Sequence, residues 1–316
     1  GLVFRDGKPV IYDSGDYPGC QSEALEKIDY SGFAERQKAA LAEGRYIGIG
    51  IGNYVEGTGL GPFEGATVRV SPSGKIFLMT GAAPQGQGHR TTMAQLCAEK
   101  FGVDIADVEV HLADTTKIAH GVGTFASRIA ANAGPSVHMA SLDVREKAIK
   151  IAAYMLEAAE EDIELEDGKA FVRGVPEMSK TLGEIAHAVA GSPGFAMPPG
   201  FEPGLEATHY FSPSQSAYCN GTHVVEVEVD IETGHVQILR YVIAHDSGNL
   251  INPMIVDGQV QGGLAHGIGN ALFEEQFFDE NANPLTTTFA EYLIPGASDV
   301  LDAETIHVVS PSPLNP

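Results

Sequence analysis

A plan of β-hairpin, glycine–glutamine turn and helix occurs twice along the chain, and it constrains the fold most strongly. In the first copy, residues 66–70 and 75–79 alternate as strands do around a Ser-Pro-Ser-Gly turn. Gly86-Gln87-Gly88 follow, and apolar residues at helical spacing predict a helix from about Thr91. The first copy is therefore a hairpin followed by a packed helix.

The second copy lies near the other end of the chain. Residues 224–230 alternate valine with acidic residues, and residues 236–244 return after a Glu-Thr-Gly turn. Gly258-Gln259 then mark the start of a helix that we expect to end at about Phe273. The repeat predicts an α+β protein of two similar lobes, each made of β-hairpins or sheets with packed helices.

Changes of composition divide the chain into four parts. Residues 1–44 are a lead-in segment with a helix expected from about Ser22 to Glu43, interrupted near Ser31-Gly32. The first lobe covers residues 45–190. A connector with five prolines and four glycines follows at 191–214, and the second lobe covers 215–316.

Further elements are expected in the first lobe. Gly48–Gly52 alternate glycine with isoleucine without the G-x-G-x-x-G spacing, so a glycine-rich strand is favoured over a dinucleotide site. Residues 108–112 alternate as a strand, and a long helix runs to about Ala159. The acidic stretch Glu157–Asp167 is expected to be a solvated helix end and loop.

Charge and cysteine usage exclude several classes of protein. With 42 acidic and 19 basic residues the net charge is −23, which disfavours binding to nucleic acid or an anionic membrane. The three cysteines are far apart, so a disulfide framework, a zinc site and an iron–sulfur cluster are not expected. No histidine pattern indicates a metal held by protein ligands, and no secretory or membrane-spanning pattern occurs. We expect a cytoplasmic protein.

The glycine–glutamine turns suit a bound anion with a heterocyclic edge. Glycines permit close approach, the first N–H groups of a helix attract an anion, and a glutamine amide both donates and accepts. A third polar turn, Thr124–Arg128, also precedes a helix, and Arg128 would supply the positive charge. The alternative for each turn is a tight bend with a solvated polar side chain.

Four ordered motifs carry a resemblance to a known family. They are Gly86–Gln95, Gly123–Arg128, His245–Pro253 with Gly258–Gly263, and Glu291–Pro295. These runs resemble the molybdenum-cofactor-binding part of the molybdenum hydroxylases, the family of xanthine dehydrogenase, aldehyde oxidoreductase or oxidase, and carbon monoxide dehydrogenase. The resemblance implies a two-lobed domain that holds molybdopterin, in many bacterial members as the cytosine dinucleotide. It also implies oxidative hydroxylation of an aldehyde or heterocycle, or a related oxidation, with water as the oxygen source.

The resemblance also implies roles for individual residues. Gln87 would face the metal and pterin, Gln259 the pterin, and Phe125 and Ala126 the metal. The other implied cofactor-binding residues, mostly at the phosphate and nucleotide end, are Gly86, Gly88, His89, Thr92, Thr124, Ser127, Arg128, Asp246 and Asn252. Tyr54 and Glu56 fall where family members line the substrate channel.

Four of these residues also have purely structural interpretations. His89 is explained as well by an N-terminal helix residue whose ring has its hydrogen bonds satisfied. Tyr54 is equally well explained as a core residue. The alternative for Asp246 and Asn252 is that they cap the loop between a strand and a helix.

The chain departs from the family pattern in what it lacks. The family's general-base glutamate lies in a G-x-G-E motif beyond a segment like Ser310–Pro316, so we expect no catalytic residue here. We expect a fragment of a large subunit, truncated or from a split gene, that is inactive alone and binds the cofactor weakly or not at all. Its expected partners are the preceding half of the subunit and iron–sulfur and flavin subunits or domains, in a dimer of heteromers. The alternative is a non-catalytic cofactor-carrier or assembly module.

Overall fold

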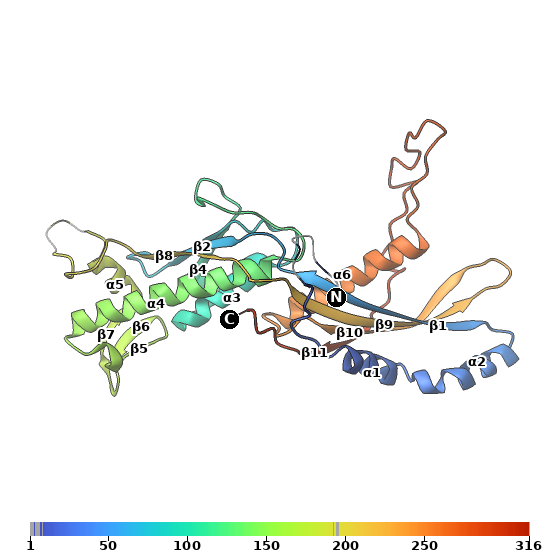
Figure 1. Cartoon of the computed structure of the whole chain (residues 1–316), viewed down its shortest axis with the longest axis horizontal. Coiled ribbons are helices and arrows are strands. Elements are labelled where there is room, and N and C mark those ends of the chain that lie inside the picture. The colour runs from blue at the N-terminus through green and yellow to red at the C-terminus, as the bar shows by residue number, and fades with distance from the viewer. Residues whose placement is uncertain (1–2, 4–6, 8, 192, 194–195, 316) are drawn as a thin grey trace. The chain divides into compact units, whose positions relative to one another are not determined.

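The structure, a computed structural model, describes residues 3, 7, 9–191, 193 and 196–315 (Figure 1). The chain forms two compact units. Unit 1 contains residues 1–56 and 218–312, and unit 2 contains residues 57–217 and 313–316. In the described part of the chain, no helix combines the length and the apolar character needed to cross a membrane.

Unit 2 is built on a four-stranded mixed sheet. Its strands, in the order β4-β3-β2-β8, are β4 (Val108–Leu112), β3 (Ile76–Thr80), β2 (Glu64–Val70) and β8 (Leu205–Phe211). The predicted hairpin is confirmed, because β2 and β3 are antiparallel with Val68 opposite Leu78. β3 and β4 are parallel, and β2 and β8 are antiparallel.

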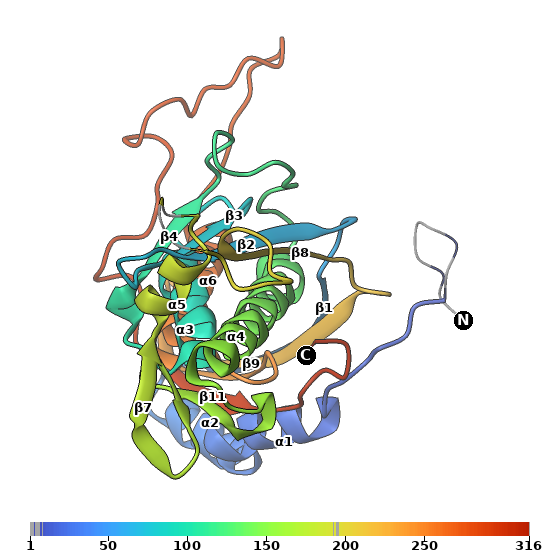
Figure 2. The same ribbon diagram turned by 90° about the vertical axis from the view of Figure 1, so that its left-hand side faces the viewer.

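Two helices cover one face of this sheet. They are α3 (His89–Phe101) and α4 (Gly134–Leu156), and α4 follows the π-helix η3 (Ile129–Ala133) (Figure 2). Alternate strand residues such as Val68 and Leu78 pack with Phe101, Val137 and Val144, all fully buried. The apolar residues at strand spacing and those at helical spacing, both visible in the sequence, therefore pack in one core.

A small second sheet packs against the same core. Its strands are β5 (Ile163–Glu166), β6 (Lys169–Val172) and β7 (Val175–Thr181); the short helices of unit 2 are η2 (Ile105–Asp107), η4 (Glu160–Asp162) and α5 (Leu182–Ala188). The prediction that Glu157–Asp167 is only a solvated helix end and loop is therefore wrong. Ile163 and Leu165 alternate with the acids and are only 6% and 5% exposed, so they hold β5 to the core.

Unit 1 has a sheet with helices on both faces. Its strands, in the order β1-β9-β10-β11, are β1 (Ile47–Thr58), β9 (Ala217–Val229), β10 (Val236–Asp246) and β11 (Glu304–Val308); its helices are α1 (Tyr17–Lys27), η1 (Tyr30–Gly32), α2 (Phe33–Ala42) and α6 (Pro253–Leu272). Val242 and Ala244 pack with α1. Ile243, which points the other way, packs with Leu264 and Ile268 of α6.

The glycine-rich strand, the second hairpin and the break near Ser31-Gly32 are confirmed by β1, by β9 with β10, and by η1. The four-part division differs from the structure. The lead-in segment belongs to the core of unit 1, where the buried Cys20 thiol donates to the carbonyl of Ala244 at 3.4 Å. The connector contains β8, which pairs along β2. Residues 192, 194 and 195 of that connector, and Pro316, lie outside the described residues.

Candidate functional site

The predicted glycine turn lies at the start of α3 in unit 2. The helix begins at His89, two residues earlier than predicted, and Gly88 is its N-cap residue with a left-handed φ of 73°. Gly86 also has a positive φ, of 108°. Because Gly88 has no side chain, no side-chain hydrogen bond caps the first turn. This end of α3 therefore offers its backbone N–H groups to an outside acceptor.

Glutamine side chains connect this turn to a second predicted segment. The Gln87 amide accepts from the backbone N–H of Gln85 at 2.8 Å and donates to the Gln85 side chain at 3.0 Å. The Gln85 amide in turn donates to the carbonyl of Thr124 at 3.3 Å. The structure thus brings the turn at 85–88 and the turn at 124–128 together. Gln85 was not among the predicted residues, although it directly precedes the glycine motif.

The turn at 124–128 has a strained backbone. Ala126 and Ser127 have φ values of 46° and 50°, so two successive residues with side chains lie in the left-handed region. Such conformations cost about 1–2 kcal/mol per residue and are concentrated at functional sites. The turn leads directly into the π-helix η3, another feature that is frequent at such sites.

The hydroxyl of Thr124 is buried in this turn. Within the part of the chain that the structure describes, its oxygen has no hydrogen-bond partner. The turn therefore keeps a polar atom available next to its strained backbone.

Arg128 anchors the turn from inside the protein. Its guanidinium has no exposed surface and donates to the Glu64 carboxylate, itself fully buried, at 2.7 Å. It also donates to the carbonyls of Gly123 at 2.6 Å, Leu60 at 2.8 Å and Phe63. The expectation that Arg128 supplies a free positive charge is corrected by this geometry, because Glu64 already neutralises it.

Glu64 is the centre of this buried network. Its carboxylate accepts from the backbone N–H groups of Gly65 at 3.3 Å, Val122 at 3.1 Å and Gly123 at 3.0 Å. A Cβ at Gly81 would lie 2.5 Å from the carboxylate and 2.7 Å from the Cα of Gly121, so two glycine backbones close around it. No motif in the sequence singles out Glu64, which is only one acidic residue at the head of a strand.

His89 and Thr92 lie in the first turn of α3, and Nδ1 of His89 is buried without a hydrogen-bond partner among the described residues. The Thr92 hydroxyl donates to the carbonyl of Gly88 at 3.3 Å. His89 is only 7% exposed, and burial lowers the pKa of its imidazole, against a smaller opposing effect of a hydrogen bond with the Ala83 backbone. His89 is therefore neutral near pH 7, and the turn carries no unpaired positive charge from Arg128 or His89.

Asp246 and Asn252, in unit 1, bond to nearby backbone. One oxygen of the buried Asp246 carboxylate accepts from the N–H groups of Gly248 at 3.0 Å and Ser310 at 3.1 Å. Its other oxygen is buried and has no partner among the described residues. Asn252 caps α6 by accepting from the N–H of Ile255 at 3.1 Å. Both residues make the loop-capping bonds that were the alternative interpretation.

Gln259 does not lie at a helix start. α6 begins at Pro253, so Gly258 and Gln259 lie inside the helix, and the predicted start there is wrong. The physical reason is that an Asn N-cap followed by proline at the first helical position is a stronger start signal than a Gly-Gln pair. The Gln259 side chain is exposed on this helix.

Tyr54 lies in a tyrosine–histidine cluster on the sheet of unit 1. Its hydroxyl is 2.5 Å from Nδ1 of His245, and its ring meets the ring of His223 edge-on at 5.7 Å. Burial raises the pKa of Tyr54 and lowers that of His245, so both are uncharged near neutral pH. Glu56 is exposed. Burial of the Cys219 thiol, and to a smaller extent the negative charge of Glu56, raises the pKa of Cys219 to about 11. The half-buried Tyr54 agrees with its alternative interpretation as a packed residue.

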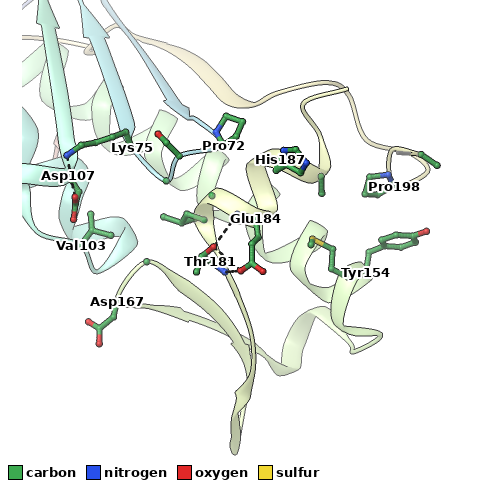
Figure 3. Close-up of a pocket in the computed structure, with 18 residues that line it drawn as sticks. Pro72, Lys75, Val103, Asp107, Tyr154, Asp167, Thr181, Glu184, His187 and Pro198 are labelled. Carbon is green, nitrogen blue, oxygen red and sulfur yellow. Dashed lines mark hydrogen bonds and ion pairs between the residues drawn. The ribbon is translucent and has the colours of Figure 1, made fainter. Parts of the chain in front are cut away.

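A hollow of about 870 Å³ elsewhere in unit 2 contains none of the predicted residues (Figure 3). Several of its polar groups already have structural partners. Thr181 and Glu184 form the capping box of α5, and Lys75 donates to the carbonyl of Ala106 at 2.7 Å. We therefore do not assign the site to this hollow. Within the described residues, no three His, Cys, Asp or Glu side chains are grouped so that they could bind a metal ion.

The chain is similar to known proteins over most of its length. A family model described as "Molybdopterin cofactor-binding domain" matches residues 23–301. The nicotine 6-hydroxylase large subunit of Paenarthrobacter nicotinovorans is 38% identical over 315 residues, covering 96% of this chain and 38% of that protein. The carbon monoxide dehydrogenase large chain of Afipia carboxidovorans is 36% identical over 322 residues, covering 96% and 39%.

The fold is also similar to a solved structure. Quinoline 2-oxidoreductase from Pseudomonas putida 86 matches with a TM-score of 0.87 and 38% identity, covering 100% of this chain and 41% of that one. This likeness confirms the predicted α+β fold. The chain spans 38–39% of the length of the two curated relatives.

Proposed function

The chain belongs to the family of molybdopterin cofactor-binding domains, and from this membership we propose that the two joined turns of unit 2 hold a molybdopterin. The observation that carries the proposal is the hydrogen bond from Gln85 to Thr124, which joins the turns at 85–88 and 124–128. Gln85 and Thr124 are 39 positions apart in the sequence, so this bond joins two segments that are distant along the chain.

The groups at these turns fit such a ligand. The start of α3 has no side-chain cap, so its N–H groups suit a phosphate. The amides of Gln85 and Gln87 both donate and accept, which matches the alternating groups on the edge of a pterin. The buried Thr124 hydroxyl, without a partner in the described structure, is a further group that a ligand atom would satisfy.

We assign roles to the residues of this chain accordingly. Gln87 and the backbone at 85–88 orient the pterin edge, and the start of α3 binds a phosphate. Phe125 is 48% exposed, and we assign its ring a contact with the bound group. The bound group supplies the redox chemistry of the reaction. The roles predicted for Tyr54, Glu56, Asp246, Asn252 and Gln259 in unit 1 stay predictions.

The reaction and the partners are proposed from the relatives. Large subunits named for the hydroxylation of nicotine and the dehydrogenation of carbon monoxide match this chain over 96% of its length. We propose that this chain is a region of such a subunit, with a molybdenum-containing molybdopterin cytosine dinucleotide. The reaction would be hydroxylation of an aldehyde or heterocycle, or a related oxidation, with oxygen from water. Iron–sulfur and flavin partners and the rest of the subunit would complete the enzyme, and the isolated chain would be inactive.

Titration of the purified chain with molybdopterin cytosine dinucleotide under nitrogen, followed by pterin fluorescence, tests the site. We expect weak but saturable binding, which Gln87→Ala weakens about tenfold, the ratio for 1.4 kcal/mol. Gln237→Ala, which removes an exposed glutamine of unit 1, is the matched control and should bind as the wild type does. Absence of saturable binding, or equal loss in both variants, would refute the site.

Elemental analysis of the chain as purified provides a second measurement. We expect molybdenum well below one atom per chain, because a region spanning 38–39% of its relatives supplies only part of the contacts. Near-stoichiometric molybdenum would show that this region alone holds the cofactor tightly.

A further inference from the structure

We propose that Glu64 is a positioning residue, which acts through Arg128 to set the conformation in which the turn at 124–127 and the Phe125 ring meet the cofactor. The proposal rests on the proposed function, because it assigns a residue to the same site. Glu64 itself has no exposed surface, so its side chain would act on a ligand only through other residues.

First, Glu64 accepts hydrogen bonds from the backbone that precedes the turn. One carboxylate oxygen accepts from the N–H groups of Val122 and Gly123 and from Arg128, within 3.1 Å of each. Gly123 has a φ of 95°, a conformation that residues with a side chain rarely adopt. The carboxylate therefore fixes the point at which the chain enters the turn.

Second, Arg128, the last residue of the turn, is fixed by the hydrogen bonds that its side chain donates. Its guanidinium is rigid and planar, and here it spans the carbonyls of Gly123, Leu60 and Phe63 as well as Glu64. The entry and the exit of the turn are thus tied to one buried ion pair. The residues between them, Ala126 and Ser127, are kept in the left-handed region by this closure.

Third, Arg128 contacts the exposed ring of Phe125. The Arg128 guanidinium lies 5.1 Å from the centroid of the Phe125 ring, within the range of a cation–π contact. On the same side, a Cβ at Gly61 would lie 3.3 Å from Arg128 and 3.5 Å from the Phe125 ring, so the chain passes closely over both. A displacement of Arg128 therefore moves the ring that faces the ligand.

A tryptophan reporter distinguishes positioning from a merely structural role. The chain contains no tryptophan, so Phe125→Trp, excited at a wavelength where tyrosine does not absorb, gives a single tryptophan emission that reports on this ring. We measure its emission maximum and its quenching by acrylamide in the full chain without cofactor, in the Glu64→Gln and Glu64→Asp backgrounds. Glu99→Gln makes the same chemical change at a side chain that is 70% exposed, and is the matched control.

We expect Glu64→Gln to shift the emission to longer wavelength and to increase quenching, while circular dichroism stays that of the folded chain. Glu64→Asp, which keeps the charge but shortens the reach, should give a smaller shift in the same direction. Without the reporter, Glu64→Gln should weaken binding of molybdopterin cytosine dinucleotide about tenfold, with Glu99→Gln unchanged. If Glu64→Gln does not fold, Glu64→Asp alone decides by the same readouts.

The same emission and quenching in the Glu64 and Glu99 variants would overturn the proposal. Loss of binding without any change of the reporter would also overturn it, since the effect would then bypass the turn. If the wild-type chain binds no cofactor, the proposed function fails, and the reporter measured without cofactor decides alone whether the ion pair sets the turn.

Discussion

Replacement of Arg128 by methionine tests how strongly the buried ion pair stabilises unit 2. The variant Arg128→Met keeps a long side chain but removes the charge and the donors to Glu64, Gly123, Leu60 and Phe63. Removal of one partner of a buried pair costs about 3–5 kcal/mol. Glu64 still accepts from three backbone N–H groups, which partly stabilise its charge, so we expect about 3 kcal/mol.

The reverse replacement should cost more. In Glu64→Leu the Arg128 charge is left without a counter-ion, and the N–H groups of Gly65, Val122 and Gly123 lose their acceptor. Each orphaned buried group adds about 1–3 kcal/mol, so we expect at least about 5 kcal/mol. Each side chain makes four hydrogen bonds, so the order rests on the groups left behind: a buried N–H without an acceptor is tolerated less than a carbonyl that loses one donor.

Calorimetry combined with hydrogen exchange of unit 2 amides measures these losses. For a unit of this size, about 3 kcal/mol corresponds to a decrease in Tm of about 6–12 °C. The double variant Arg128→Met with Glu64→Leu completes a cycle that isolates the pair. A loss below about 1 kcal/mol in Arg128→Met would place the pair in the range of exposed ion pairs and refute the reasoning.

Further changes give three more predictions. Ala126→Gly relieves a left-handed residue and should raise the free energy of unfolding by up to about 1 kcal/mol in urea titrations; a lower value would contradict the strain. Burial raises the pKa of Cys97 and of Cys219 to about 11, so both stay protonated at pH 8 and should react with Ellman's reagent much faster after unfolding than before; rapid labelling of the native chain would disprove this. Burial holds the pKa of His245 in the folded state below its unfolded value, so the free energy of unfolding should fall as the pH drops below about 6.5. Melting curves at pH 7 and pH 5 should show a smaller loss of stability in His245→Gln than in the wild type. An unchanged loss would exclude His245 as its source.

Local signals predicted much of the secondary structure. The alternation in residues 66–70 and 75–79 is a period of two interrupted by a tight turn, and it needs no distant contact to be recognised. β5 was missed because its acids mask the alternation of Ile163 and Leu165, which becomes visible only through the core they join. β11 was missed because it pairs with β10 from more than 50 residues away.

The candidate site was predicted only where local sequence signals mark it. The turns at 86–88 and 124–128 are marked by glycine and by polar residues before a helix, so each was visible locally. Their junction through Gln85, and the buried role of Glu64, depend on contacts between residues about 40 and 60 positions apart. The charge of Arg128 misled the prediction, because a sequence does not show which charged side chains are paired inside the protein.

The division of the chain between the units sets an order for folding. Residues 57–217 of unit 2 are continuous, whereas unit 1 joins residues 1–56 to residues 218–312. During synthesis, α1 and β1 emerge before β9 and β10 and lack these sheet neighbours until the whole of that insert has been made. The contact between Cys20 and Ala244, 224 positions apart, closes late. The edges of the glycine-rich strand β1 therefore stay unpaired until β9 is made, and an unpaired edge can pair with another chain. We expect misassembly to affect unit 1 more than unit 2.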